Sequence, residues 1–296
     1  MTMLKAFLEH IDRNFSFLKE SKFLIAISGG VDSVVLTHLC HQAKYNFALA
    51  HCNFKLRAEE SDADETFVIQ LAEKIKTEVF IESFDTEVFA NAHGISVQMA
   101  ARELRYDWFH RLHKQLGYDY VLTAHHADDN LETFLINISR GTGLDGLLSI
   151  PKINHEIVRP LLEFSQEDIN SYANKENLEW REDNSNASDR YLRNALRHDV
   201  IPALKTINSG FLNNFLKTQS HLQESKLIVD SAVERIRKKV LSVENDVLKI
   251  NLNKLLKYEH HKAYLFELLK DYGFSAWEDV YHLTEAQSGK YVLSST

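Results

Sequence analysis

A six-residue loop, Ser28-Gly29-Gly30-Val31-Asp32-Ser33, is the stretch of this sequence whose residue types and spacing point most directly to chemistry. The apolar run at residues 23–27 before it favours a buried strand, and residues 34–39 after it favour a helix. The glycine pair allows the backbone to turn sharply between the two. Because the first N–H groups of the helix and the positive end of its dipole face the loop, we expect an anion there, above all a phosphate or pyrophosphate.

This loop differs from two better-known phosphate loops. The sequence has neither G-x-x-x-x-G-K-[ST], with its lysine, nor G-x-G-x-x-G. Without a lysine, the loop would hold phosphates through backbone N–H groups and the hydroxyls of Ser28 and Ser33. Asp32 would then repel the phosphates unless a Mg²⁺ ion lay between them. The alternative is a plain strand-to-helix turn that Ser28 or Asp32 caps.

A second polar stretch, rich in histidine and acid, follows a predicted strand at residues 120–124. It comprises His125, His126, Asp128, Asp129 and Glu132. Two imidazoles and three carboxylates at the end of a strand are costly to bring together without a cation or hydrogen bonds that compensate them. This favours a functional site. The alternative is an acidic helix N-terminus, where the helix dipole favours Asp and Glu.

Two arginine-bearing segments could also meet an anion. Arg102 lies within one turn of Arg105 and Tyr106 in a predicted helix, where the alternative is a solvated, ion-paired face. Arg140 stands before Gly141 in a glycine-dense loop of a glycine-poor chain, so it is predicted to lie in a backbone-exposing loop beside an anion.

A basic stripe is predicted further along. Arg190, Arg193 and Arg197 have offsets of three and four, which place them on one face if the segment is helical. In an acidic chain such a stripe favours contact with nucleic-acid phosphates. The alternative is a solvated face, since no acid stands beside these arginines at i+4.

The elements that would position these residues alternate between strand and helix. Apolar runs predict strands at residues 23–27, 47–50, 79–81, 120–124 and 157–162, the last an edge strand that a proline ends. Helices are predicted at residues 4–17, 34–39, 61–76, 97–109 and 165–173. This alternation predicts an α/β fold with a parallel sheet, in which His51, at the end of its strand, would approach a nucleotide.

Beyond Pro202 the strand pattern stops, and a long helix is predicted at residues 212–240. We therefore expect two domains, residues 1–210 and 211–296, the second smaller and mainly helical. Within it we expect a helix at residues 263–269 and short strands at residues 247–250 and 291–293.

Composition narrows the functional classes. With 296 residues the chain can form a full core and two domains. Its net charge of −8 argues against a protein that coats nucleic acid indiscriminately, although a specific nucleic-acid substrate stays open. Cys40 and Cys52 are too far apart for a C-x-x-C pair, so buried thiols are favoured over a metal cluster with His38, His41 and His51. Without an apolar membrane segment or a signal peptide, we expect no membrane and a cytoplasmic protein.

Taken together, the motifs resemble those of the tRNA(Ile)-lysidine synthetases, members of the ATP pyrophosphatases that share the SGGxDS loop. The resemblance rests on the loop at residues 28–33 and on five further stretches: Ala100-Ala101-Arg102-Glu103-Leu104-Arg105-Tyr106, residues 123–133, Arg140-Gly141-Thr142-Gly143, Arg159-Pro160-Leu161-Leu162, and Arg193-Asn194-Ala195-Leu196-Arg197-His198. It implies a Rossmann-like ATP pyrophosphatase domain with a parallel sheet, followed by a smaller domain.

The resemblance also implies a two-step reaction on the wobble cytidine of an isoleucine tRNA with a CAU anticodon. ATP adenylates the C2 oxygen of the base and releases pyrophosphate, and the ε-amine of free L-lysine then displaces AMP. ATP and Mg²⁺ are the implied cofactors, and the tRNA and L-lysine are the implied partners. A homodimer is left open.

Roles follow from the same resemblance and from charge complementarity. ATP would be bound by Ser28, Gly29, Gly30, Val31, Asp32 and Ser33, with His51 near the adenine. Developing charge would be neutralised by Arg102 and Arg140. Mg²⁺ or the amines of lysine would be received by Asp128, Asp129 and Glu132, with Asp32 and Asp129 as metal ligands. The tRNA phosphates would be contacted by Arg190, Arg193 and Arg197.

Two other classes of function compete with this one. A tRNA thiolase or an amide-forming synthetase would share the loop, but no sulfur-transferring C-x-x-C is present, and an amidotransferase would need a glutaminase domain. A nucleotide sensor without catalysis would not need Asp32 or the acidic stretch at Asp128. Pyrophosphate release that depends on tRNA separates these possibilities.

Overall fold

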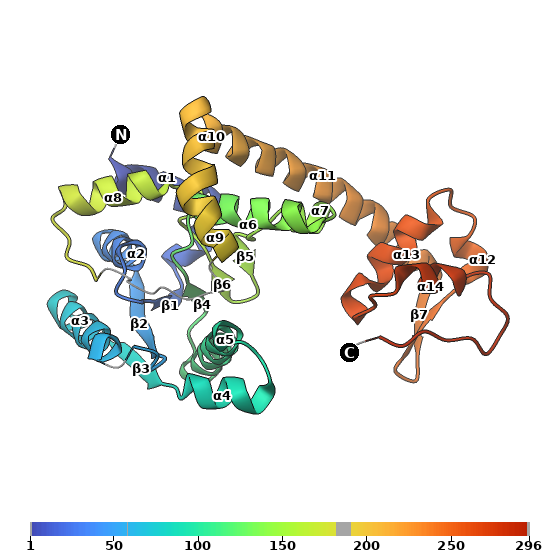
Figure 1. The fold of residues 1–296 in the computed structure, drawn as a ribbon, viewed down its shortest axis with the longest axis horizontal. Helices are drawn as coiled ribbons and strands as arrows, with labels where there is room; N and C mark the ends of the chain where they lie inside the picture. Colours follow the sequence, from blue (N-terminus) through green and yellow to red (C-terminus); the bar gives the residue numbers. More distant parts are fainter. Residues whose placement is uncertain (1, 58, 182–190, 295–296) are drawn as a thin grey trace. The chain divides into compact units, whose positions relative to one another are not determined.

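The computed structural model describes residues 2–57, 59–181 and 191–294 and consists of two compact units, Met1–Gln219 and Ser220–Thr296 (Figure 1). The division between the units falls inside the long helix α11 (Phe211–Val240). The domain boundary that the sequence predicts after residue 210 stays a prediction.

The first unit is built on a sheet with the strand order β3-β2-β1-β4-β6-β5. Its strands are β1 (Lys22–Ala26), β2 (Asn46–Asn53), β3 (Val79–Ser83), β4 (Tyr120–Leu122), β5 (Ile153–Asn154) and β6 (Ile157–Val158). All neighbours pair in parallel except β5, which is antiparallel to β6. The predicted α/β fold is therefore confirmed, and the carboxyl ends of β1, β2, β4 and β6 meet at one edge of the sheet.

The helices of this unit are α1 (Met3–Asn14), α2 (Val31–Gln42), α3 (Glu59–Ile75), α4 (Thr86–His93), α5 (Val97–Leu116), α6 (Ala127–Arg140), α7 (Leu144–Leu147), α8 (Gln166–Lys175), α9 (Tyr191–Ala195) and α10 (Ile201–Ile207). A 3₁₀ turn covers Ser16–Lys19, and a π-helical segment covers Leu196–Val200. Ser165 caps α8 as predicted, because its Oγ accepts the N–H of Asp168 at 3.0 Å.

Alternation along β1 explains how both faces of the sheet are covered. Phe23 and Ile25 point into a core formed with α1, α2, α3 and α8, whereas Leu24 points into a second core formed with α5. All three side chains are fully buried. The central strand is thus apolar from Phe23 to Ala26, as expected for a parallel sheet covered by helices on both sides.

Two strand predictions for the chain need correction. The strand expected at residues 157–162 is limited to Ile157–Val158 and is not the edge, because β5 folds back and pairs with it. Residues 291–293 form no strand. Val292 instead packs against the apolar cluster of the second unit. A segment of this length can make such a contact without pairing to another strand.

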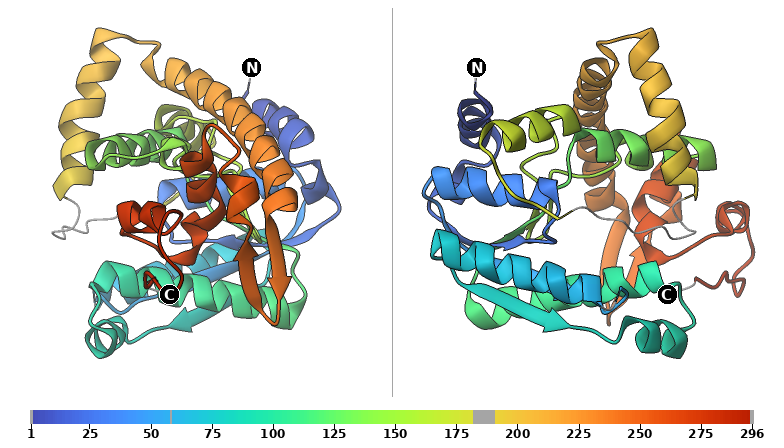
Figure 2. Two further views of the ribbon diagram at one scale, coloured as in Figure 1. Left: turned by 90° about the vertical axis from the view of Figure 1, so that its right-hand side faces the viewer. Right: turned by 60° about the vertical axis from the view of Figure 1, so that its left-hand side comes forward.

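The second unit joins the rest of α11 to an antiparallel hairpin of β7 (Leu241–Glu244) and β8 (Val247–Ile250), visible in Figure 2. The helices α12 (Leu252–Leu255), α13 (His261–Leu269) and α14 (Trp277–His282) follow, with a 3₁₀ turn at Lys270–Tyr272. Val233, Leu255 and Leu265 lie in their common core. The unit is mainly helical, as predicted.

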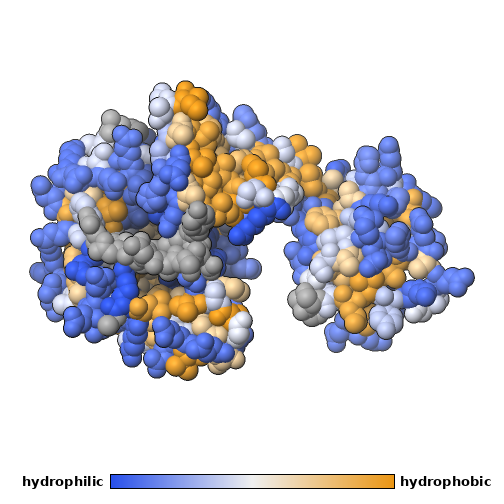
Figure 3. All heavy atoms as spheres, in the orientation of Figure 1, coloured by the Kyte–Doolittle hydropathy of each residue, from blue (hydrophilic) through white to orange (hydrophobic). Residues whose placement is uncertain are grey.

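Hydropathy differs along the surface of the first unit. Figure 3 shows apolar side chains along α10, where Ile207 is exposed, while much of the surface over α1 and α8 is hydrophilic. No helix within the described residues combines the length and the apolar character needed to cross a membrane.

Candidate active site

The loop between β1 and α2 is held closed by its two serine hydroxyls. Ser33 Oγ accepts the N–H of Ser28 at 3.2 Å and donates to the Gly30 carbonyl at 2.9 Å. Ser28 Oγ in turn accepts the N–H of Gly30 at 3.3 Å. No side chain within the described part of the chain caps the start of α2. The first N–H groups of this helix therefore face the loop as an anion site requires.

Gly29 holds the turn of this loop in a conformation that favours glycine. Its φ is +94°, and its carbonyl accepts the N–H of Arg181 at 2.9 Å. A Cβ atom at this position would lie 3.5 Å from Phe67, an ordinary contact, so space alone would admit alanine. The backbone conformation is what requires glycine here.

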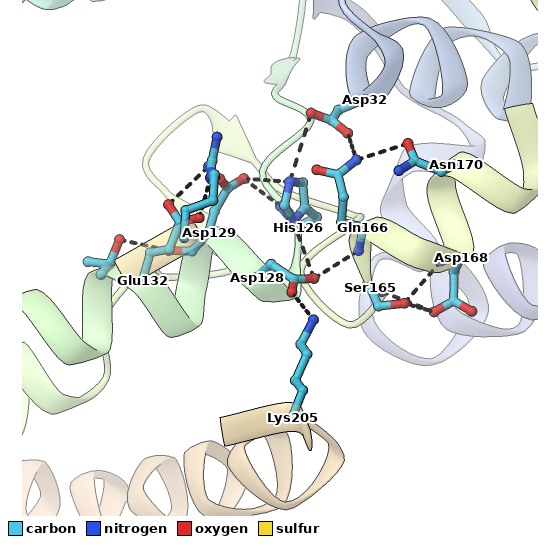
Figure 4. Close-up of polar contacts among 12 residues, drawn as sticks. Asp32, His126, Asp128, Asp129, Glu132, Ser165, Gln166, Asp168, Asn170 and Lys205 are labelled. Atoms are coloured by element: carbon cyan, nitrogen blue, oxygen red, sulfur yellow. Dashed lines mark hydrogen bonds and ion pairs between the residues drawn. The ribbon is translucent and has the colours of Figure 1, made fainter. Parts of the chain in front are cut away.

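His126 lies between two carboxylates from different elements (Figure 4). Its Nε2 is 3.8 Å from Oδ2 of Asp32, which belongs to α2, and 3.3 Å from Oδ2 of Asp129 in α6. The same oxygen of Asp129 accepts the backbone N–H of His126 at 3.1 Å, which caps α6. The loop after β1 and the helix after β4 thus meet around one buried imidazole, whose side chain is 3% exposed.

Gln166, the first residue of α8, fixes the carboxylate of Asp32. Its Nε2 donates to Oδ1 of Asp32 at 2.7 Å. Burial raises the pKa of Asp32, and the nearby His126 and the hydrogen bond from Gln166 oppose this shift only in part. A cation beside this carboxylate would favour its charged form.

Asp128 lies on the other side of His126, with its Oδ2 3.9 Å from Nδ1 of the imidazole, and holds three elements together. Its Oδ2 accepts the backbone N–H of Gln166 at 2.8 Å, and its Oδ1 accepts from the ammonium of Lys205 in α10 (Figure 4). Burial alone would raise the pKa of Asp128, but the Gln166 N–H and the Lys205 ammonium outweigh burial and lower it. Asp128 therefore ties α6 to α8 and α10. Its catalytic role stays a prediction.

Glu132 is also occupied by protein partners. It is almost fully buried, and Arg197 donates to it from Nε at 2.6 Å and from Nη2 at 3.0 Å, a bidentate contact. Arg193 Nε lies 3.4 Å from the same carboxylate, and Arg197 Nη2 lies 3.3 Å from Asp129. The acids that pair with Arg193 and Arg197 belong to α6. Because they lie far away in the sequence, no acid at i+4 from these arginines could predict the ion pairs.

A cavity of about 650 Å³ opens beside these residues at the carboxyl edge of the sheet. Its lining includes Ser28, Asp32, Ser33, Asp129 and Arg193, together with Arg102, Arg105, Tyr106, His125 and Arg159. The guanidinium of Arg102 lies 4.9 Å from the ring centre of Tyr106, and that of Arg105 lies 5.1 Å from the ring centre of Phe54. The cavity thus combines a phosphate loop, two carboxylates, and guanidinium groups stacked on aromatic rings.

His125 also lines this cavity, and it is uncharged at neutral pH. Burial lowers its pKa to about 4, and the positive charges of Arg159 and Arg105 act in the same direction, against Asp129. Its Nδ1 lies 2.9 Å from Oγ1 of Thr123.

The described site residues that were predicted but do not line this cavity are Gly29, Gly30, Val31, His51, Asp128, Glu132, Arg140 and Arg197. His51 is buried, and its Nδ1 lies 2.9 Å from the Ile27 carbonyl; its neighbours Ala50 and Cys52 line the cavity because side chains alternate along β2. Arg140 ends α6, on the order of 20 Å from the first turn of that helix. Arg190 lies outside the described residues.

Four residues that complete the site were not among the predicted ones: His126, Arg159, Gln166 and Lys205. His126 lies in the stretch at residues 123–133, and Arg159 begins the Arg159-Pro160-Leu161-Leu162 motif. The sequence therefore marked both positions but did not predict their roles. Gln166 and Lys205 contact acids far away in sequence, and no local pattern marks such a contact.

The donor set fits one kind of metal ion. Mg²⁺ binds proteins through one or two carboxylates and completes its shell with waters and substrate phosphates, and Asp32 and Asp129 offer such oxygens beside the phosphate loop. No three His, Cys, Asp or Glu side chains of the described ranges gather into a metal site. Cys40 is buried as predicted, whereas Cys52 is only partly buried and lines the cavity. Burial raises the pKa of the Cys52 thiol to about 12 and also raises that of Cys40.

Comparison with known proteins agrees with this geometry. The family described as PP-loop domain matches residues 3–204, and the TilS substrate binding domain matches residues 243–296. The fold and the loop thus define an ATP-binding protein of the PP-loop class. A tRNA(Ile)-lysidine synthase of Bacteroides thetaiotaomicron is 37% identical over 97% of this chain and 67% of its own length, and one of Chlorobaculum tepidum is 32% identical over 97% of this chain and 90% of its own. The chain belongs to the tRNA(Ile)-lysidine synthase family.

The lengths of the relatives differ from that of this chain. It spans about two thirds of the Bacteroides relative and 55% of one from Porphyromonas gingivalis, which is 38% identical over 85% of this chain. Among solved structures, the U34-tRNA thiolase NcsA of Methanococcus maripaludis has a TM-score of 0.60 at 17% identity, covering 75% of this chain and 80% of its own. That likeness concerns the fold alone.

Proposed function

We propose that this protein uses ATP to join free L-lysine to the wobble cytidine of an isoleucine tRNA with a CAU anticodon. In the first step the C2 oxygen of the cytosine attacks the α-phosphorus of ATP, the bond between the α-phosphorus and the bridging oxygen breaks, and pyrophosphate leaves. In the second step the lysine ε-nitrogen bonds to C2, the bond from C2 to oxygen breaks, AMP leaves, and a proton leaves the nitrogen. The family membership of the chain supports this reaction.

The observation that carries the proposal is the meeting of Asp32 and Asp129 around His126, at the cavity that the phosphate loop enters. The loop at residues 28–33 would hold the triphosphate through N–H groups and hydroxyls. Asp32 and Asp129 would hold Mg²⁺, which would neutralise phosphate charge as the α-phosphorus is attacked. Arg102, from the cavity wall, would stabilise the same charge.

The contacts of each remaining side chain decide which of its predicted roles we propose. Asp129 is the one of the three acids that lines the cavity, so we propose that its carboxylate receives Mg²⁺ in the first step and an amine of lysine in the second. Glu132 acts through Arg197, and Asp128 acts by fixing α8. The side chains of Arg193 and Arg197 are about half exposed despite their ion pairs, so we retain them as contacts for tRNA phosphates. ATP, tRNA and free lysine meet in the cytoplasm, where we propose that the reaction takes place.

The test is incorporation of labelled lysine into RNA. The chain is incubated with ATP, Mg²⁺, [¹⁴C]lysine and an isoleucine tRNA transcript with a CAU anticodon, and a transcript with a GAU anticodon serves as the control. We expect label in the CAU transcript alone, with one AMP and one pyrophosphate for each lysine bound. Label in both transcripts, or ADP as the nucleotide product, would contradict the proposal.

A further inference from the structure

Arg159 is a buried cation that the described protein does not neutralise. It directly follows β6 and is only 4% exposed. Within residues 2–57, 59–181 and 191–294, Nη1 donates to the Pro151 carbonyl at 2.9 Å, while Nε is buried without an acceptor. No carboxylate of these residues forms an ion pair with it. A buried positive charge without a counter-ion destabilises the protein unless an anion binds to it.

The position of Arg159 in the sheet separates it from the phosphate loop. The strands β1, β4 and β6 are neighbours, and the phosphate loop follows β1 while the acidic helix α6 follows β4. Since adjacent strands lie about 4.8 Å apart, Arg159 is roughly 10 Å across the sheet from the loop, with the carboxylate of Asp129 on the helix between. The phosphate loop and Arg159 therefore offer an anion two separate places along the edge of the sheet.

The cavity joins Arg159 to the carboxylate proposed to hold an amine. Both Arg159 and Asp129 line it, and His125, which lines it too, is uncharged at neutral pH. A ligand with an ammonium group at one end and a carboxylate at the other would match this pair of charges. A tRNA phosphodiester, carrying a ribose on each side, is too bulky to reach an arginine residue that is only 4% exposed.

We infer that Arg159 binds the α-carboxylate of the lysine substrate and thereby selects the amino acid over simple amines. The inference rests on the proposed function, because it takes lysine as the substrate. Arginine suits the task, since its planar guanidinium pairs with carboxylates through charge-assisted hydrogen bonds. The two ends of lysine would then be fixed by Asp129 and Arg159, which orients the nucleophilic amine.

Comparison of lysine with cadaverine, which lacks only the carboxylate, tests the inference in the unaltered protein. With ATP and tRNA saturating, we expect kcat/KM for cadaverine to be at least about tenfold below that for lysine, the scale of a lost hydrogen bond to a charged group. Equal use of the two amines would overturn the inference while leaving the proposed function intact. Absence of lysine incorporation together with absence of pyrophosphate exchange would instead count against the proposed function.

The variant Arg159→Gln localises the effect. We expect KM for lysine to rise about tenfold or more while use of cadaverine changes little, so that the preference for lysine collapses. Arg13→Gln, on the exposed face of α1, is the matched control and should keep the preference. Arg159→Lys, which keeps the charge, should recover part of it if Arg159→Gln folds poorly. An increase in KM for ATP, or weaker tRNA binding with lysine use unchanged, would assign Arg159 to a phosphate and overturn the inference.

Discussion

Replacement of Asp128 by alanine should destabilise the protein much more than replacement of its neighbour Asp129 by asparagine. The structure gives Asp128 two hydrogen-bond donors, the N–H of Gln166 and the ammonium of Lys205, and leaves it 8% exposed. A hydrogen bond to a charged group contributes about 1.5–3 kcal/mol, and a partner left without its acceptor adds to the loss. We therefore expect Asp128→Ala to lower the free energy of unfolding by about 2–4 kcal/mol.

Thermal and urea unfolding would measure this difference. For a domain of this size, the melting temperature of Asp128→Ala should fall by roughly 4–16 °C. Asp129→Asn keeps an oxygen for the His126 N–H, so its stability should stay within about 1 kcal/mol of the unaltered protein while lysine incorporation falls. Lys205→Met, combined with Asp128→Ala in a double-mutant cycle, should show a coupling of about 1 kcal/mol or more.

The opposite pattern would refute the reasoning. If Asp128→Ala melted within about 1 °C of the unaltered protein and yet released no pyrophosphate, Asp128 would be a group that touches substrate, and its contacts with α8 and α10 would be incidental. Assays at a temperature where every variant is folded keep the two explanations apart.

Three further predictions concern charge. The pKa of Glu163 is lowered to about 2, first by its hydrogen bond with His10. The carboxylate therefore stabilises the protein above its ordinary pKa of 4.5, and this stabilisation is lost as the pH falls toward 2. Glu163→Gln should lower the free energy of unfolding by roughly 1–2 kcal/mol at pH 7, allowing for exposure, and urea titrations should show the difference between variant and unaltered protein narrowing below pH 4.5. Replacing Arg193 and Arg197 by glutamine should weaken tRNA binding and reduce the slope of log K against log salt by about 1–2, and an unchanged slope would return both to a structural role. Asp32→Ala should abolish pyrophosphate release with circular dichroism unchanged, and turnover near normal would remove Asp32 from the metal site.

The phosphate loop could be predicted from the sequence because its chemistry is local. Six consecutive residues that lead from an apolar run into the first turn of α2 contain the glycine at φ +94° and the two serines whose hydroxyls close the turn. The short-range alternation of strand and helix likewise predicted the parallel sheet. The pairing of very short strands could not be predicted in this way. With two residues, β5 has too little pattern to be recognised, and because it pairs with β6, β5 and not β6 forms the edge of the sheet.

The division of labour among the acids could not be predicted in this way. Asp128 and Asp129 are neighbours of one type, and about 100° of helical rotation sends one toward Lys205 and the other toward the cavity. Glu132, one turn further, meets Arg197 from a segment 65 residues away. Contacts of this kind depend on tertiary packing, which a local charge pattern does not contain.

Exchange of labelled pyrophosphate into ATP tests the central claim most directly, namely that the base and not the amino acid is activated. The carboxylate of lysine needs no activation if its amine is the nucleophile. We predict that exchange occurs with the CAU-anticodon tRNA present and lysine absent, that it is lost in Asp32→Ala, and that Asp129→Asn impairs any remaining lysine use more than exchange. Exchange that requires lysine and runs without tRNA would show that lysine is adenylated and would contradict the account.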